Sequence, residues 1–171
     1  MTTCDFQFWT LIATWLAAIG TVSAVIVSLY VLISNRKISI SITSDIYQFE
    51  GGKECLIIKV TNTGLRSVVI NNCHCIYFQI GRFKSKKFIA IGTNYIDQRN
   101  SSSFPCQLTE GEVLNLVISL ENEDGNWLQN FKSEYLKGVP LSTLKVVVCP
   151  NVSKSIKTAV GNSIIKKLRS Y

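Results

Sequence analysis

The sequence has few of the groups from which active sites are built. It contains one histidine, His74, and eleven Asp and Glu residues, of which only Asp5 precedes residue 36. Motifs typical of serine hydrolases, zinc peptidases and nucleotide-binding folds (G-x-S-x-G, H-E-x-x-H, G-x-x-x-x-G-K-[ST] and G-x-G-x-x-G) are absent from it. An acid–base or triad mechanism would have His74 as its one candidate, with no obvious partner in sequence. We therefore expect a protein that is not an enzyme and uses no cofactor.

Charge is missing from one long stretch near the N-terminus. No Asp, Glu, Lys or Arg occurs from Phe6 to Asn35, and most side chains there are apolar. As a helix, Phe8 to Ile33 would extend about 39 Å, which is enough to cross a hydrocarbon core of about 30 Å. We expect residues 1–35 to be a single-pass transmembrane anchor. A cleavable signal peptide fits less well, because no Lys or Arg precedes the run and the run exceeds an ordinary h-region.

The charges beside this span predict its orientation. Arg36 and Lys37 follow it directly, whereas the preceding flank carries Asp5 and the terminal amine. The positive-inside rule then places the N-terminus outside and the large domain in the cytoplasm, and we expect the span in the cell inner membrane. The domain also holds an odd number of cysteines, which fits reduced cytosolic thiols: Cys55, Cys73, Cys75, Cys106 and Cys149.

One side of the expected helix is formed by small residues. Steps of four, three, four and four residues place them on one face: Ala13, Ala17, Gly20, Ala24 and Ser28. Small side chains let membrane helices approach closely, so this face is a candidate for self-association or for docking on other membrane helices. The alternative is that Ala and Gly are simply frequent in membrane helices.

The chain after residue 35 is dominated by short alternating or apolar runs separated by turn residues. This pattern indicates a mainly β domain, an antiparallel β-sandwich over residues 36–161, followed by a basic tail over residues 162–171. Apolar residues at helical spacing predict one short helix from Trp127 to Lys137. Strands are expected at Ile38–Phe49, Cys55–Val60, Val68–Ile70, Cys73–Ile80, Phe88–Ile91, a short edge segment beginning at Phe104, Val113–Leu120, Leu144–Cys149 and Ser155–Val160.

Two segments carry a resemblance to a known group of proteins. Val60-Thr61-Asn62-Thr63-Gly64-Leu65-Arg66-Ser67-Val68-Val69-Ile70 and Leu108-Thr109-Glu110-Gly111-Glu112, after a long uncharged helix and a basic pair, resemble small membrane-anchored proteins of bacteria and prophages. The resemblance implies an immunoglobulin-like sandwich as the soluble part. Asn62, Gly64 and Gly111 would make turns in it. The helix at Trp127 and the basic tail depart from the pattern, and the group transfers no chemistry.

Cys73-His74-Cys75 is the densest cluster of metal-ligating residue types. A structural zinc site needs four ligands. If the segment is a strand, alternation sends Cys73 and Cys75 to one face and His74 to the other, so that one ion cannot easily meet all three. We therefore expect buried apolar thiols and no metal.

Positive charge is concentrated after the span. All 18 Lys and Arg lie at or beyond Arg36, against ten acidic residues there, so this part has a net charge of +8. Two clusters stand out: Arg82, Lys84, Lys86 and Lys87, and Lys154, Lys157, Lys166, Lys167 and Arg169. Three interpretations stay open, namely attraction to an anionic leaflet, binding of an anionic ligand such as a nucleotide, and plain solvation.

These patterns favour a membrane-anchored, non-enzymatic cytoplasmic adaptor. Its expected partners are the lipid bilayer and either a protein or further copies of the chain, in an accessory role of a bacterial host or mobile-element system such as antiphage defence. The alternative is a ligand-gated membrane effector, whose basic domain senses an anionic nucleotide and whose helices disturb the bilayer. Nucleic acid is not an expected partner.

Overall fold

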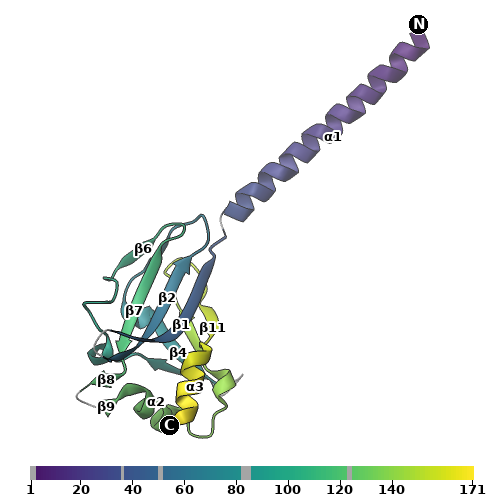
Figure 1. The fold of residues 1–171 in the computed structure, drawn as a ribbon. Coiled ribbons are helices and arrows are strands. Elements are labelled where there is room, and N and C mark those ends of the chain that lie inside the picture. The colour runs from purple at the N-terminus through teal and green to yellow at the C-terminus, as the bar shows by residue number, and fades with distance from the viewer. Residues whose placement is uncertain (1–2, 36, 50–51, 82–85, 123–124) are drawn as a thin grey trace. The chain divides into compact units, whose positions relative to one another are not determined.

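The computed structural model describes residues 3–35, 37–49, 52–81, 86–122 and 125–171. The chain forms two compact units, residues 1–37 and residues 38–171. The first consists of one long helix, and the second contains the described strands and the shorter helices (Figure 1).

Helix α1 extends from Thr3 to Asn35. Its segment Gln7–Ile33 has 27 residues and a mean hydropathy of 2.4. Apolar side chains are exposed along its length, including 65% of Leu16 and 71% of Ile33. Exposed apolar surface of this length is stable in lipid but not in water. The helix is therefore long and apolar enough to cross a membrane, as the uncharged run predicts.

Three strands form one antiparallel sheet in the order β1–β2–β7. They are Ile40–Gln48, Glu54–Asn62 and Val113–Ser119. The register places Ile42 opposite Val60 and Val60 opposite Leu114, so that these apolar side chains share one face. All three are buried, which explains the alternation seen in the sequence.

Four further strands form an antiparallel sheet in the order β11–β10–β4–β5. They are Ile156–Ala159, Lys145–Val148, Ile76–Ile80 and Lys87–Ala90. The expected pairing of the last two strands of the chain is confirmed. Two short antiparallel pairs complete the described strands: β3 (Val68–Ile70) with β6 (Cys106–Leu108), and β8 (Glu121–Asn122) with β9 (Gly125–Asn126).

Asn62 joins the first of these short pairs to the three-stranded sheet. Its buried amide nitrogen donates to the backbone oxygens of Arg66 and Leu108, at 2.9 and 3.0 Å. Its side-chain oxygen accepts from the backbone nitrogen of Gly64 at 3.0 Å. Asn62 therefore fixes the turn that follows β2, as expected from the Asn-Thr-Gly sequence.

Helix α2 is Trp127–Tyr135, and the side chain of Asn126 caps its first turn by accepting from the backbone nitrogens of Leu128 and Gln129. It ends two residues before the expected Lys137. Leu136 forms the cap, and Gly138 follows with a φ of +73° that favours glycine. Three 3₁₀ turns also occur among the described residues: η1 (Cys73–Cys75), η3 (Thr93–Tyr95) and η4 (Leu141–Thr143).

The basic C-terminal segment is a helix, α3 (Asn162–Ser170), that packs against β1 and α2 (Figure 1). Ile164 and Leu168 are buried. The hydroxyl of Ser163 donates to Asp45 Oδ1 at 2.9 Å and accepts from the backbone nitrogen of Ile46 at 3.2 Å. The segment is therefore part of the β-rich unit.

One hydrophobic core is shared by both larger sheets and by α2 and α3. Its buried side chains include Ile42, Leu56, Ile58, Val60, Leu114, Leu116 and Ile118 from the three-stranded sheet, Ile76, Phe78, Ile80, Ile89, Val146 and Val148 from the four-stranded sheet, and Trp127, Phe131, Ile164 and Leu168 from the helices. The second unit is thus a mostly antiparallel β-rich domain with short helices.

Candidate functional site

Strand β5 forms one edge of the four-stranded sheet, and β11 forms the other. Among the described residues β5 pairs with β4 and with no other strand. Phe88 is 60% exposed, and its ring packs edge-on against Tyr77 with the centroids 5.7 Å apart. An exposed edge strand presents backbone N–H and C=O groups that can pair with another chain. The β5 edge is therefore accessible both through its backbone and through an apolar side chain.

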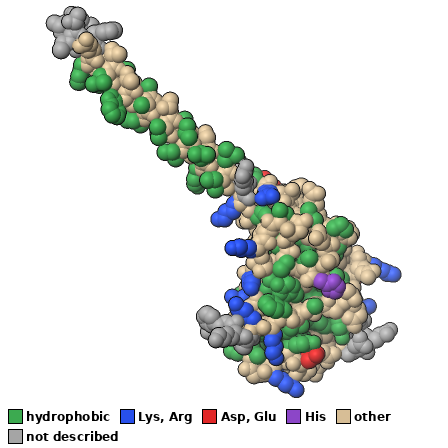
Figure 2. Space-filling model, turned by 180° about the vertical axis from the view of Figure 1, so that it is seen from behind, with side chains coloured by type: hydrophobic (Ala, Val, Ile, Leu, Met, Phe, Trp, Pro, Cys, Tyr) green, Lys and Arg blue, Asp and Glu red, His purple; other side chains and the backbone are tan. Residues whose placement is uncertain are grey.

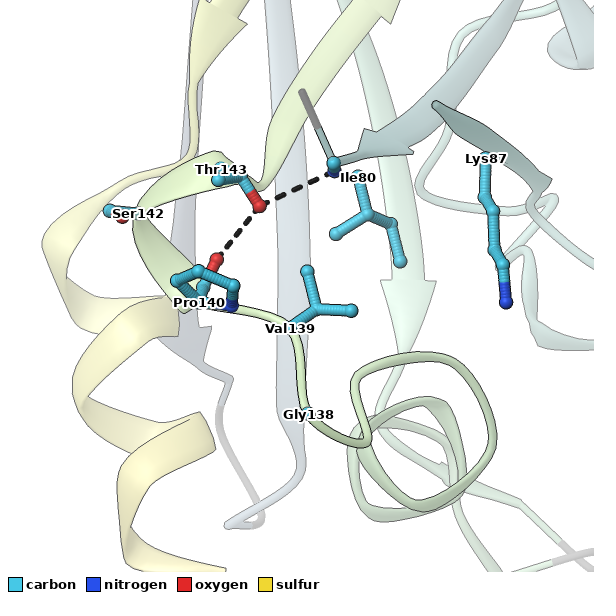
Figure 3. A pocket seen from close by; sticks show the side chains of 8 residues that line it. Ile80, Lys87, Gly138, Val139, Pro140, Ser142 and Thr143 are labelled. Atoms are coloured by element: carbon cyan, nitrogen blue, oxygen red, sulfur yellow. Dashed lines mark hydrogen bonds between the residues drawn. The ribbon is translucent and has the colours of Figure 1, made fainter. Parts of the chain in front are cut away.

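A hollow of about 580 Å³, the lysine hollow, lies between β5 and the loop that follows α2. It is lined by Ile80, Gly81, Lys87, Gly138, Val139, Pro140, Ser142 and Thr143. In the close view, Ile80 and Val139 project between the Lys87 side chain and Pro140 (Figure 3). Thr143 Oγ1 accepts from the Gly81 backbone nitrogen at 3.3 Å and donates to the Pro140 oxygen at 2.8 Å. The first bond ties the loop to the end of β4, and the second closes a turn within the loop.

A second hollow of about 210 Å³, the aromatic hollow, lies between β5 and α2. It is lined by Ile89, Ala90, Gly92, Tyr95, Trp127, Asn130, Phe131, Glu134 and Tyr135. The rings of Trp127 and Phe131 are stacked at 5.0 Å, and Tyr95 is 6.4 Å from Trp127. Glu134 is exposed, and its hydrogen bond with the hydroxyl of Tyr135 raises the pKa of that tyrosine. The hollow thus combines aromatic faces with a carboxylate.

The two hollows lie along the same strand and have opposite chemical character. Lys87 contributes to one, and Ile89 and Ala90 contribute to the other. The lysine ammonium attracts an anion, whereas ring faces beside Glu134 attract a cation. This arrangement supports binding, and among the residues that line the two hollows no nucleophile, base and orienting group of a hydrolytic site come together.

The first predicted basic cluster is only partly covered by this description. Arg82 and Lys84 lie outside the described residues. Lys86 is exposed, and Lys87 lines the lysine hollow. Binding of an anionic ligand by this cluster stays a prediction.

The second predicted basic cluster is divided among different contacts. Lys166 and Arg169 are exposed on α3, whereas Lys167 Nζ lies 2.6 Å from Glu54 Oε2. The hydrogen bond with Glu54 raises the pKa of Lys167. Lys157 Nζ donates to Gln79 Oε1 at 2.7 Å. Lys and Arg side chains are nevertheless spread over the face of the domain seen in Figure 2, where few acidic side chains are visible.

The small residues predicted for helix packing all lie within α1 and are exposed: Ala13, Ala17, Gly20, Ala24 and Ser28. The Ser28 hydroxyl donates to the Ala24 backbone oxygen at 2.8 Å, which satisfies it within the helix. Hydrophobic side chains, in green, lie along the whole helix in the space-filling view, interspersed with tan backbone and other side chains (Figure 2). The role of the five small residues in self-association stays a prediction.

The expectation that Cys73, His74 and Cys75 lie on a strand is wrong. They form the 3₁₀ turn η1, because the side chain of Asn72 accepts a hydrogen bond from the backbone nitrogen of Cys75 and so caps the turn. His74 is exposed. Within the part of the chain that the structure describes, no three His, Cys, Asp or Glu side chains are placed to hold a metal ion.

Sequence reasoning does not identify several residues of the two hollows. Tyr135 is expected in the helix only as an apolar residue, and Glu134 carries no signal because an isolated carboxylate on a helix is usually solvated. Tyr95 and Thr143 lie in short 3₁₀ turns that have no periodic pattern. The one signal in the sequence for this site is the pair Lys86 and Lys87, which directly precedes the strand expected at Phe88–Ile91.

Comparison with known proteins does not assign the site. No protein-family model matches the chain, and a search of curated proteins finds no match.

Proposed function

We propose that this protein is a membrane-anchored, non-enzymatic interaction module that binds a protein partner. The observation that carries the proposal is the β5 edge, which pairs with no second strand among the described residues and has an exposed Phe88 and two hollows along it. Open edges flanked by side-chain pockets are a recurrent mode of peptide and protein recognition. The module would serve as an accessory component of a bacterial host or mobile-element system, such as antiphage defence.

The proposal includes an immunoglobulin-like sandwich as the scaffold. Its support is that the inward residues of the three-stranded and four-stranded sheets belong to one core. A sandwich of two antiparallel sheets with alternating inward residues has this property.

The proposal also places α1 in a bacterial inner membrane and the β-rich unit in the cytoplasm. Its support is the apolar span Gln7–Ile33 and the basic pair, Arg36 and Lys37, that follows it. The cytoplasmic side would also suit free thiols, and the five described cysteines of the β-rich unit are unpaired with one another.

Native mass spectrometry of the intact chain, extracted in detergent, tests the adaptor function. A specific protein partner should co-purify with the wild type. Phe88→Asp places a charge on the β5 edge and should release the partner. Val152→Asp is the matched control, because Val152 is also an exposed apolar residue (48%) but belongs to the turn before β11, and it should retain the partner. The adaptor function is refuted if no protein partner is found, or if Phe88→Asp retains it.

A second function is favoured by one observation, the size of the lysine hollow. A cavity of about 580 Å³ lies within the range for small-molecule sites, and Lys87 lines it. In this alternative an anionic nucleotide binds near Lys86 and Lys87, and rearranged helices disturb the bilayer. A nucleotide retained by the wild type and by Lys166→Glu, but lost from Lys87→Glu, would establish it. Unchanged retention in Lys87→Glu would exclude it.

A further inference from the structure

We propose that the β5 edge binds an extended segment of the partner protein that carries an acidic and a basic side chain two residues apart, with an apolar residue between them. This inference rests on the proposed adaptor function and specifies the chemistry of the partner. The occupant is a strand-forming peptide segment, bound by backbone pairing to β5 and selected by the lysine hollow and the aromatic hollow.

Strand geometry sets the spacing of the two charged side chains. Lys87 lies opposite Ile80 and Ile89 opposite Phe78, so that Lys87 and Ile89 share the face of the sheet that α2 covers. Residues two apart on a strand are separated by about 6.8 Å. A strand added to β5 would follow the same repeat. Its side chains at positions i and i+2 would therefore reach the lysine hollow and the aromatic hollow respectively.

The charge preference at the first position comes from the lysine hollow. Lys87 is exposed at its border, while Ile80 and Val139 supply an apolar floor (Figure 3). Among the described residues, none of the side chains that line this hollow is acidic, so Lys87 meets no carboxylate of the hollow itself. A glutamate or aspartate of the bound strand would meet Lys87 beside apolar surface, where water screens an ion pair less than on an open face.

The preference at the second position has the opposite sign. Tyr95 and Tyr135 are the partly exposed aromatic side chains of this hollow, Trp127 and Phe131 are buried beneath it, and the exposed Glu134 belongs to the same lining. A lysine or arginine side chain entering there would gain a cation–π contact and a carboxylate. The aliphatic part of such a side chain would pack on the rings.

The residue between the two charges would project to the other face of the sheet. Phe88 lies on that face, opposite Gln79, and its ring is 60% exposed apart from its edge contact with Tyr77. Cross-strand contact with an aromatic ring favours an apolar or β-branched residue. In the direction of β5, the segment is therefore acidic, apolar and basic. Its own sequence has this order if it is added parallel to β5 and the reverse order if it is added antiparallel.

Binding of synthetic peptides to the intact chain in detergent tests this inference directly. Four heptapeptides of equal composition are compared by fluorescence anisotropy: Glu-Val-Lys at the centre, Lys-Val-Glu at the centre, and one adjacent-charge control for each. One of the two spaced peptides should bind about tenfold more tightly than its control. Methylating the backbone nitrogens that pair with β5 should abolish that binding, because strand addition requires them.

Charge reversal on the protein locates the two positions. Lys87→Glu should weaken binding of the preferred peptide by about tenfold, and a peptide whose acidic residue is replaced by lysine should bind this variant better than it binds the wild type. Lys145→Glu is the control, because Lys145 is an exposed lysine of β10 outside the described lining of both hollows, and it should leave the affinity unchanged. Glu134→Lys should likewise weaken binding of the preferred peptide, and a peptide whose basic residue is replaced by glutamate should bind this variant better than it binds the wild type. Glu121→Lys is the control and should leave the affinity unchanged.

Three results would overturn the inference. The first is equal affinity for spaced and adjacent charges, the second is binding that survives backbone methylation, and the third is a homodimer of the wild type that Lys87→Glu dissociates, because a second copy would then cover β5. A protein partner that co-purifies and is released by Phe88→Asp, while no peptide discriminates, would refute the charge pattern and leave the adaptor function intact. If no protein partner co-purifies with the wild type, the adaptor function itself is refuted.

Discussion

Lys167 forms an ion pair within the β-rich unit. Its ammonium contacts both carboxylate oxygens of Glu54, at 2.7 and 2.6 Å, and joins α3 to the start of β2. The two side chains are 31% and 30% exposed, so water screens the pair appreciably. We expect Lys167→Ala to lower the free energy of unfolding by about 0.5–1 kcal/mol.

The neighbouring lysine provides the control for this ion pair. Lys166 is exposed on the same helix, and Lys166→Ala should leave the free energy of unfolding within about 0.5 kcal/mol of the wild type. Urea denaturation of the intact chain in detergent, followed by circular dichroism, gives both values. Equal losses in the two variants would show that Glu54 contributes nothing specific.

Tyr77 predicts how stability responds to alkaline pH. Its hydrogen bond with the thiol of Cys149, together with burial, raises its pKa to about 12. An unfolded tyrosine ionises near pH 10. Tyr77 therefore contributes stability that is fully present below about pH 10 and is lost as pH rises towards about 12.

The same reasoning predicts the effect of removing the phenol. Tyr77→Phe should make the fall in unfolding midpoint above about pH 10 shallower than in the wild type. Tyr171→Phe, at the exposed C-terminus, is the comparison, and its profile should follow that of the wild type. Thermal unfolding at a series of alkaline pH values measures both. Profiles that coincide for all three proteins would contradict the assignment to Tyr77.

At the level of elements, much of the β-rich domain follows from local sequence. The alternation around Ile42 and the apolar run from Leu144 predict strands that the structure contains, because each buries one side of a pleated surface. Periodicity alone misses local capping, so that it predicts a strand from Cys73 to Cys75 although Asn72 closes a 3₁₀ turn there. It also cannot show that α3 packs on β1, which depends on residues more than 100 positions apart.

Gly161 shows how closely α3 and β1 approach. A Cβ at this position would overlap the backbone oxygen of Ser44 and lie 2.7 Å from Asp45 Oδ1. The backbone nitrogen of Gly161 also donates to Ser44 Oγ at 3.1 Å. Because the obstacle is backbone of a paired strand, we expect Gly161→Ala to displace α3 and to cost about 2–4 kcal/mol of unfolding free energy.

A second glycine separates this effect from the loss of glycine itself. Gly20 lies within α1, and a Cβ added there would meet no atom of the described residues within 4 Å beyond its own helix backbone, so Gly20→Ala should leave the β-rich unit unchanged. Hydrogen exchange of the intact protein measures protection of α3 directly. Normal protection of α3 in Gly161→Ala would contradict this prediction, because it would show that β1 can shift to accommodate the added Cβ with little loss of unfolding free energy.

Helix α1 has a face of small residues that predicts self-association. The small residues on one face would allow two copies to approach closely, so Gly20→Ile should weaken self-association by about threefold or more. Val22→Leu adds bulk to the opposite face and should have no effect. Energy transfer between labelled copies in lipid vesicles measures both variants. If neither differs from the wild type, the small face reflects composition alone.

At the level of the whole molecule, the candidate site is less predictable than the fold. Its two hollows combine β4, β5, the turn at Tyr95, α2 and the loop from Gly138 to Thr143. Only tertiary packing brings these segments together. No local sequence pattern indicates that Glu134 lines a hollow beside the one that Lys87 lines. The lysines before β5 can be identified from the sequence, because charge is visible residue by residue.

Orientation is a property of the whole chain, and the native cysteines can report it. Cys4 precedes the span Gln7–Ile33, whereas Cys73 and Cys75 lie in the partly exposed turn η1 beyond it. Arg36 and Lys37 favour retention of the β-rich unit in the cytoplasm. A membrane-impermeant maleimide added to intact spheroplasts should therefore modify Cys4 and leave the other thiols unmodified.

Two variants make the labelling decisive. Cys4→Ser should abolish modification of intact spheroplasts, and detergent should restore it through the thiols of the β-rich unit. A Cys73→Ser, Cys75→Ser double variant should still be labelled at Cys4 in intact spheroplasts. The opposite pattern, with label on the β-rich unit before any detergent is added, would place the β5 edge outside the cell. Its partner would then be an extracytoplasmic protein, and the two basic residues after the span would not have determined the orientation.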